Sequence, residues 1–222
     1  MSGAYPQMRD IAPIVYVVDD DESFLTAISR LLRANGFSVR TFSSAHEFLT
    51  QRDTETPGCV LADLRMPGMN GLDLQSALAQ SANPLPMLFL TGQGDIPSSV
   101  RAMREGAEDF LEKRAPKETL LDAVTRALGR DSRERAARER RRELRARFDM
   151  LTERELEVLS HVVRGQLNKQ IAGDLGLHER TVKLHRTAIT TKLKVHSVAE
   201  LTRLTHDAGI FPEPARTFPK GQ

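Results

Sequence analysis

In the first half of the chain, residues able to do chemistry stand where short apolar runs end. The run "IVYVV" leads into Asp19 and Asp20, and the run "CVLA" leads into Asp63. Two later runs, "PMLFL" and "DFL", lead to Thr91 and Lys113. A carboxylate at the mouth of a buried strand is costly unless a partner offsets its charge. This pattern therefore indicates a site where several carboxylates share a cation.

The residue types in this pattern suit phosphoryl transfer. Hard carboxylate oxygens that leave room for water favour Mg²⁺, which bridges to phosphate groups. The Asp63 carboxylate could then attack a phosphoryl group and form an aspartyl phosphate. Lys113 would neutralise phosphoryl oxygens, and the Thr91 hydroxyl would hydrogen-bond to one of them. Helix capping explains an acid such as Asp21, but it does not explain compatible residues after four separate strands.

Such a site requires strands that end at the same edge of one sheet. Apolar runs alternate with stretches of helical spacing, and the predicted strands cover residues 14–18, 37–42, 59–62, 86–90 and 109–111. Strands that are apolar on both faces and joined by helices indicate an α/β fold with a doubly wound five-stranded parallel sheet. In such sheets the functional site lies beyond the carboxyl ends of the strands.

The composition limits the number of domains and the location. The chain has 222 residues with 40% apolar content, enough for one large or two ordinary domains. It has no apolar run long enough to cross a bilayer, and its first residues, "MSGAYPQMRD", lack the features of a secretory signal. Cys59 is the only cysteine, so an internal disulfide is excluded. We therefore expect a cytoplasmic protein without a membrane partner.

Charge is divided unevenly along the chain. Residues 1–125 carry 11 Lys and Arg against 17 Asp and Glu, whereas residues 126–222 carry 21 against 13. An acidic half followed by a basic half favours two domains with different partners, the second partner being a polyanion such as DNA. A well-solvated basic surface is the plainer interpretation of the same charge.

The second half has the pattern of a small all-α domain. Thr152 followed three residues later by Glu155 is a capping box that opens a helix. A short helix over 168–175 and another starting near Glu179, separated by "GLH", predict a helix-turn-helix. In that motif the later helix enters the major groove of DNA.

Residues that face outward from this later helix are expected to meet DNA. They are Thr181, Lys183, Leu184, His185, Arg186, Thr187 and Lys192. Lysine and arginine neutralise phosphates, while Leu184 and Thr187 could touch base edges or a thymine methyl. A lone histidine such as His185 is as often structural as it is a base contact, and both roles stay open.

Four motifs in order, Asp19-Asp20, "DLRMPGMNG", "LTGQGD" and "DFLEK", resemble the receiver domain of bacterial two-component response regulators. The resemblance covers residues 12–128 and implies a flavodoxin-like sheet with Asp63 as phosphoacceptor. It also implies Mg²⁺ ligands from Asp20, Asp63 and the backbone carbonyl of Arg65, with Asp19 completing the acid pocket.

The same resemblance implies a switch and a role for two further residues. Thr91 and Phe110 would form a switch pair, with an ordinary core aromatic as the alternative for Phe110. Receiver domains catalyse their own phosphorylation and dephosphorylation, and Arg65 and Gln93 would tune the lifetime of the phosphoryl group. A true phosphohydrolase is disfavoured, because such enzymes usually have an acid where Arg65 stands.

One departure from the receiver pattern leaves an alternative open. The family usually follows its lysine with a proline in a cis peptide, whereas Arg114 follows Lys113 here. A cis bond without proline costs about 3 kcal/mol, so we expect a trans or strained peptide. If the lysine were displaced, the receiver would be a phosphate-independent docking module.

The motifs "LTERELEVL", "NKQIAGDLGL", "TVKLH" and "KLKV" resemble the LuxR-type output domain of NarL/FixJ-class regulators, over residues 148–208. The resemblance implies that Lys183 and His185 contact DNA, that Asn168 and Lys169 lie near phosphates, and that the last helix forms the dimer surface. Residues 129–147 are then a charged helical linker that continues the preceding helix, with Gly129 as the one place where it could break, and residues 209–222 are a C-terminal tail.

These resemblances imply a DNA-binding transcription regulator rather than an enzyme. A sensor histidine kinase would phosphorylate Asp63, and the partners would be promoter DNA, RNA polymerase and a second copy of the chain. The homodimer would form on DNA or on phosphorylation. Phosphorylation could relieve inhibition by the receiver or drive dimerisation, and the sequence leaves both open.

Overall fold

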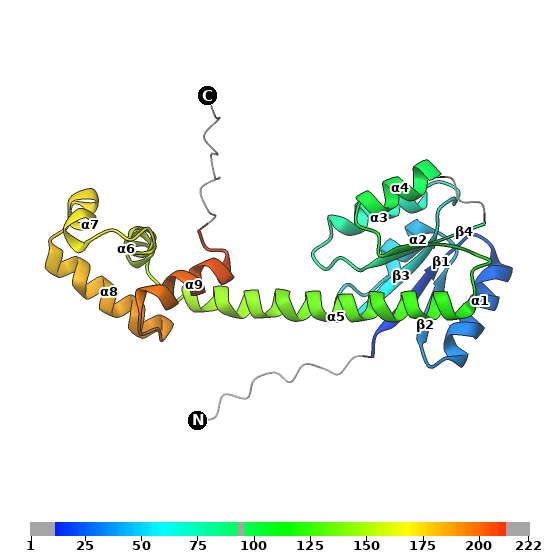
Figure 1. Ribbon diagram of the computed structural model, residues 1–222, viewed down its shortest axis with the longest axis horizontal. Helices are drawn as coiled ribbons and strands as arrows, with labels where there is room; N and C mark the ends of the chain where they lie inside the picture. The colour runs from blue at the N-terminus through cyan, green and yellow to red at the C-terminus, as the bar shows by residue number, and fades with distance from the viewer. Residues whose placement is uncertain (1–11, 93–95, 212–222) are drawn as a thin grey trace. The chain divides into compact units, whose positions relative to one another are not determined.

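The computed structural model describes residues 12–92 and 96–211, so Gln93 lies outside the described residues (Figure 1). By its contacts the chain divides into two compact units, with the boundary between Arg135 and Ala136. Within the described ranges, no helix combines the length and the apolar character needed to cross a membrane.

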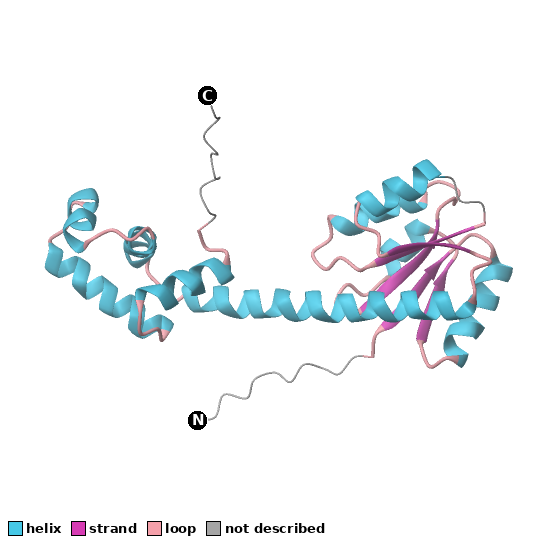
Figure 2. Cartoon of the chain, viewed as in Figure 1, coloured by secondary structure: helices cyan, strands magenta, loops and turns pink. Residues whose placement is uncertain are grey.

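The first unit is built on a parallel sheet of five strands in the order β2-β1-β3-β4-β5 (Figure 2). The strands are β1 Ile14–Val18, β2 Ser38–Phe42, β3 Gly58–Asp63, β4 Met87–Thr91 and β5 Asp109–Glu112. The predicted five-stranded parallel α/β sheet is confirmed. The strands at Asp63 and Thr91 run slightly further than expected, so these two residues end their strands rather than follow them.

Helices cover both faces of this sheet. They are α1 Glu22–Ala34, α2 Ala45–Gln51, α3 Gly71–Ala79, α4 Ile96–Arg104 and α5 Lys117–Phe148. Side chains alternate along each strand, so Tyr16 and Val18 pack in a core with α2, α3 and α4, while Val15 and Val17 pack in a second core with α1 and α5. Two buried faces explain why the strands read as continuous apolar runs.

Helix α5 continues without interruption through Gly129. The expected continuation of the helix into the charged segment is therefore observed, and Gly129 does not break it. The segment is rich in Ala, Arg, Glu and Leu, which are strong helix formers and offset the cost of about 1 kcal/mol that one glycine brings. Residues of α5 up to Arg135 belong to the first unit, and those from Ala136 belong to the second.

A buried carboxylate attaches α5 to the sheet. Asp131 is 1% exposed, and its Oδ2 accepts a hydrogen bond of 2.8 Å from the backbone N–H of Gly58, at the start of β3. Arg135 donates from Nε to the same carboxylate at 2.9 and 3.0 Å. Its other nitrogens donate to the backbone carbonyls of Glu55 and Thr56, both at 3.0 Å. Asp131 and Arg135 thus satisfy donors and acceptors of a loop far away in sequence.

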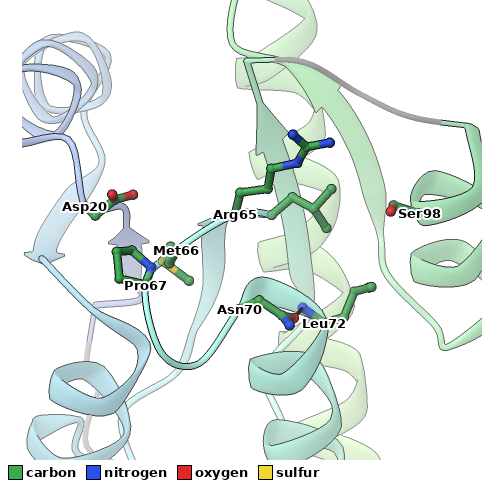
Figure 3. A pocket seen from close by; sticks show the side chains of 8 residues that line it. Asp20, Arg65, Met66, Pro67, Asn70, Leu72 and Ser98 are labelled. Atoms are coloured by element: carbon green, nitrogen blue, oxygen red, sulfur yellow. Dashed lines mark hydrogen bonds between the residues drawn. The ribbon is translucent and has the colours of Figure 1, made fainter.

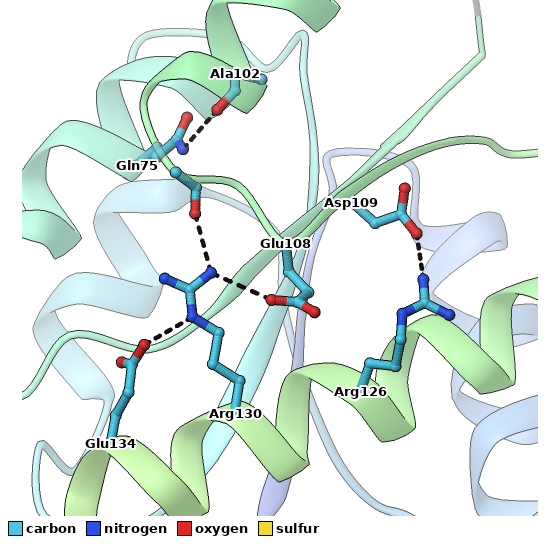
Figure 4. A network of polar contacts seen from close by, with 8 residues as sticks. Gln75, Ala102, Glu108, Asp109, Arg126, Arg130 and Glu134 are labelled. Carbon is cyan, nitrogen blue, oxygen red and sulfur yellow. Dashed lines mark hydrogen bonds and ion pairs between the residues drawn. The ribbon is translucent and has the colours of Figure 1, made fainter. Parts of the chain in front are cut away.

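Further ion pairs join α5 to β5 and the loop before it (Figure 4). Arg130 contacts Glu134 at 2.7 Å and Glu108 at 3.2 Å, and Arg126 contacts Asp109 at 2.5 Å. These arginines are partly exposed, so each pair contributes little to stability, about 0–1 kcal/mol. The buried pair of Asp131 and Arg135 is the stronger constraint on the helix.

The second unit is a small bundle of helices. It contains the end of α5 and the helices α6 Glu153–Val163, α7 Asn168–Leu175, α8 Glu179–Leu193 and α9 Val198–Ala208. The predicted capping box is present, because Thr152 caps α6 and the Glu155 carboxylate accepts from the Thr152 N–H. Leu159, Ile171 and Ile189 are fully buried in one core shared by α6, α7 and α8.

The buried carboxylate on α5 yields a stability prediction. We expect Asp131→Ala to lower the free energy of unfolding of the first unit by about 3 kcal/mol, because it leaves Arg135 and the Gly58 N–H without their partner. Urea denaturation followed by tyrosine fluorescence measures this unit, since both tyrosines, Tyr5 and Tyr16, precede residue 136. The control Glu139→Ala removes an exposed carboxylate from the same helix and should change the value by less than about 0.5 kcal/mol. Equal free energies of unfolding for the two variants would show that Asp131 does not attach α5 to the sheet.

Candidate functional site

An ammonium group bridges two carboxylates at the carboxyl edge of the sheet. The Lys113 Nζ lies 2.6 Å from Oδ2 of Asp19, which follows β1, and 3.2 Å from Oδ2 of Asp63, which ends β3. Lys113 itself follows β5, and its backbone N–H donates to the carbonyl of Thr91 at 2.8 Å. Because all strands are parallel, residues from three separate strand ends meet at one place.

Burial and charge set the protonation of this group of residues. Burial raises the pKa of Asp19, while hydrogen bonds from Lys113 and from the Asp21 N–H partly oppose it. Burial by itself lowers the pKa of Lys113, but hydrogen bonds and charge interactions with Asp19 and Asp63 outweigh it and raise that pKa. The lysine therefore stays cationic at neutral pH. Its Nζ also lies 4.4 Å from the ring centre of Phe24, a cation–π contact that sequence reasoning missed.

The carboxylates are close enough to share a cation. Asp19, Asp20 and Asp63 each offer an oxygen, and these oxygens lie within 4.8 Å of one another. Asp20 is exposed and Asp63 is half-buried, which leaves coordination positions open to water. Hard oxygen donors with access to water fit Mg²⁺. Asp21 is not part of this cluster, because its side chain caps α1 by accepting from the N–H groups of Ser23 and Phe24.

A hollow of about 530 Å³ opens beside the acids (Figure 3). Asp20 and Pro67 line one side of it and Ser98 on α4 the other, with Arg65 between them. Arg65 thus lies in the loop that leaves β3, beside the same opening as Asp20. A small phosphodonor or a phosphoryl group could approach the acids from this side.

Thr91 and Phe110 occupy neighbouring strands. Thr91 is 2% exposed and lies one residue beyond Leu90, the partner of Asp63 in the register of β3 and β4. Phe110 is half-buried on β5, with its ring 5.9 Å from that of Phe89. The ring therefore packs on the core but retains exposed surface.

Arg114, which stands where the receiver family usually has a proline, does not displace Lys113. None of the described peptide bonds is cis, so the bond between Lys113 and Arg114 is trans, as expected. The ammonium nevertheless reaches both carboxylates. A displacement of Lys113, which a phosphate-independent receiver would require here, is therefore not observed.

In the second unit, the residues expected to meet DNA gather on α8 and on the start of α7. Lys183, Leu184 and Thr187 are exposed on α8, and Lys169 is exposed on α7. Thr181 and His185 are half-buried. Leu184 is 65% exposed, so its side chain is accessible for contact with a partner.

Arg186 and Asn168 join the two helices. The Arg186 Nη1 donates to Oδ1 of Asn168 at 2.8 Å. Both side chains are half-buried and line a hollow together with Leu167, Lys183 and Thr187. This hydrogen bond positions the start of α7 against the middle of α8.

Lys192 makes an ion pair that sequence reasoning missed. Its Nζ lies 2.7 Å from Oε2 of Glu155, whose side chain is 7% exposed, and this hydrogen bond holds the pKa of Glu155 below its usual range. The ammonium compensates a buried carboxylate of the capping box, while the Lys192 side chain itself is 35% exposed. Its contact with DNA phosphate stays a prediction.

Comparisons with known proteins match both parts of the chain. Residues 15–125 match the family model "Response regulator receiver domain", and residues 149–205 match "Bacterial regulatory proteins, luxR family". The response regulator protein TodT of Pseudomonas putida is 42% identical over 209 residues, which cover 91% of this chain and 92% of TodT.

Two solved structures extend over both parts as well. The low-resolution structure of the response regulator StyR is 47% identical with a TM-score of 0.71, covering 88% of this chain and 98% of StyR. Full-length FixJ from B. japonicum is 34% identical with a TM-score of 0.54, covering 90% of this chain and 98% of FixJ.

Gly71 gives a prediction about how the acids are positioned. A Cβ added to this first residue of α3 would lie 2.5 Å from the backbone oxygen of Asp63 and 2.8 Å from the Phe89 ring. We expect Gly71→Ala to lower the free energy of unfolding of the first unit by about 2 kcal/mol. Mg²⁺ affinity, measured by isothermal titration calorimetry, should fall as well because the strand end that carries Asp63 must shift.

Gly92→Ala is the matched control, since the described part of the chain leaves space around a Cβ there. Gly92→Ala should leave the free energy of unfolding and the Mg²⁺ affinity near their wild-type values. Unchanged Mg²⁺ binding in Gly71→Ala would show that the close approach of α3 does not position Asp63.

Proposed function

This chain belongs to the transcriptional response regulators of the NarL/FixJ class, which join a receiver domain to a LuxR-type DNA-binding domain, and we propose that phosphorylation of Asp63 switches its binding to promoter DNA. Members of this family are regulators of transcription rather than enzymes. The observation that carries the proposal is the contact of the Lys113 ammonium with both Asp19 and Asp63.

Asp63 is the nucleophile of the proposed reaction. Its Oδ1 accepts from the Leu64 N–H at 2.7 Å, which fixes the carboxylate, while Oδ2 faces Lys113 at 3.2 Å. Attack of a carboxylate oxygen on a phosphoryl group forms the acyl phosphate and releases the donor. Lys113 then compensates negative charge on the transferred group.

Receiver domains in general bind Mg²⁺, and the donor set of this chain fits that ion. Asp20, Asp63 and the backbone carbonyl of Arg65 would hold it, with Asp19 beside them. When bound, it supplies positive charge to the phosphoryl oxygens. Asp19 keeps a second task, since its carboxylate positions the Lys113 ammonium.

The switch would pass from Thr91 to Phe110. The Thr91 hydroxyl is buried one residue beyond the strand partner of Asp63, so it can turn toward a new phosphoryl group. Movement of this side chain would leave space for the half-buried ring of Phe110 to turn inward. Arg65, beside the opening at Asp20, would tune the lifetime of the phosphoryl group.

DNA would be read by α8. Lys183, Leu184 and Thr187 are exposed for direct contact, and Arg186 holds Asn168 beside them. Lys169 would contact phosphate from α7. Thr181 and His185, which are half-buried, would contact DNA at the edge of this surface.

The family implies a sensor histidine kinase and DNA as partners. In the proposed cycle the kinase phosphorylates the receiver, two copies pair on DNA, and RNA polymerase is recruited, all in the cytoplasm. We assign the receiver to residues 12–128, the linker to 129–147, the DNA-binding domain to 148–208 and the tail to 209–222, of which 212–222 lie outside the described residues.

Phosphorylation of the full chain tests the first half of the proposal. We expect acetyl phosphate with Mg²⁺ to add one phosphoryl group, because the acids and Lys113 supply the needed charges. Intact mass spectrometry measures this addition. Asp63→Asn and removal of Mg²⁺ with EDTA should each abolish it. Equal addition to Asp63→Asn would mean that another residue is phosphorylated.

The treated protein also tests the switch itself. Phosphorylated wild type should differ from the untreated protein in sedimentation or in DNA affinity, and Asp63→Asn should show no such difference. Identical sedimentation and DNA affinity of phosphorylated and untreated wild type would contradict switching. The receiver would then be a phosphate-independent docking module.

Lys183→Ala tests the DNA-binding surface. We expect weaker binding to every duplex tested and a slope of log affinity against log salt that is shallower by about 1, because one phosphate contact is lost. Fluorescence anisotropy at several KCl concentrations measures both. Lys183→Arg keeps the charge and should keep the slope, whereas an unchanged slope in Lys183→Ala would show that Lys183 does not meet phosphate.

A further inference from the structure

Helix α7 begins with a residue that does not suit its position. Leu167 is the N-cap residue and makes no side-chain capping bond, whereas Thr152 and Ser197 cap α6 and α9 with their hydroxyl groups. A polar N-cap side chain is worth about 1 kcal/mol over an apolar one. The Gln170 side chain accepts from the Leu167 N–H at 2.8 Å, so the reverse half of the capping box is present. With leucine at this position, α7 is therefore less stable than it would be with a polar N-cap residue.

Leu167 is also among the most exposed large apolar side chains of the described chain. It is 69% exposed and buries little surface within its own unit. Single exposed apolar residues are common and need no explanation by themselves. This leucine, however, forms the apolar wall of a hollow whose other residues are polar or cationic.

The hollow measures about 520 Å³ and lies between the start of α7 and the middle of α8. The side-chain oxygen Oδ1 of Asn168 accepts from Arg186 Nη1 and joins these two helices across the hollow. Lys183 and Thr187 stand exposed on α8, with the Thr187 hydroxyl bonded to the Lys183 backbone carbonyl. The hollow thus offers an apolar surface on one helix and an unshielded positive charge on the other.

We infer that this hollow seats one sugar–phosphate unit of bound DNA, with Leu167 packed against the deoxyribose and Lys183 against the phosphate. The inference rests on the proposed entry of α8 into DNA and deepens it. A sugar–phosphate unit has an apolar carbon face beside a negative charge, and the hollow presents the complement of both.

Such a contact positions the domain without reading bases. Because leucine carries no charge, it adds affinity but releases no counterions. Its removal should weaken binding equally at all salt concentrations, in contrast to removal of Lys183.

Leu167→Ser separates binding from folding, because serine is a better N-cap than leucine. We expect this variant of the full chain to melt no earlier than wild type, yet to bind DNA about fivefold more weakly with an unchanged salt slope. The probe is a fluorescein-labelled duplex of mixed sequence, titrated at several KCl concentrations. Leu167→Met keeps an apolar side chain and should bind like wild type. Met150→Ser, which removes a 54% exposed side chain from outside the hollow, should also bind like wild type.

The outcomes distinguish this inference from the function on which it rests. Wild-type affinity in Leu167→Ser overturns the inference, and if Lys183→Ala still loses affinity the proposed DNA surface stands. A loss of affinity in Leu167→Ser that comes with a lower melting temperature, or that Met150→Ser shares, also overturns the inference. No effect in either Leu167→Ser or Lys183→Ala overturns the DNA-binding surface itself.

Discussion

One ammonium group between two carboxylates organises the first unit. Asp19 and Asp63 end or follow neighbouring strands, and without a cation their charges would repel at the edge of a buried sheet. Lys113 reaches both from just after β5, the edge strand that lies one strand beyond β4. Its backbone N–H donates to the carbonyl of Thr91, which holds it at the same edge of the sheet. The acids can therefore be held close together and still leave Asp20 exposed for a metal ion.

The same rule, that a buried charge needs a partner, governs the rest of the molecule. Asp131 on α5 is buried, and it is compensated by Arg135 and by the N–H that begins β3. Glu155 in the second unit is buried, and Lys192 compensates it. Each unit therefore uses an internal ion pair to hold a helix, and the remaining exposed cations are available to a polyanion.

Local patterns in the sequence explain why most of the fold could be predicted. Runs of three to six residues predict the strands, and the capping box at Thr152 follows from spacing within a single turn. The helix over 168–175 was predicted from its boundary at Gly176. The helix continues through Gly129, because the helix formers on both sides outweigh one glycine. Strand ends differed by a residue at Asp63 and Thr91, since burial rather than composition sets where pairing stops.

The sequence by itself determined the five-stranded parallel sheet, the helical second domain and the gathering of acids, threonine and lysine at strand ends, because periodicity and chain order are properties of neighbouring residues. Only the tertiary structure decided which charged side chains pair with one another inside each unit. The partner of Lys192 lies 37 positions away and that of Asp131 73 positions away. The contact that excludes a side chain at Gly71 and the hollow beside Leu167 likewise depend on distances across the fold. No local pattern encodes these distances, since they arise only when separate elements pack together.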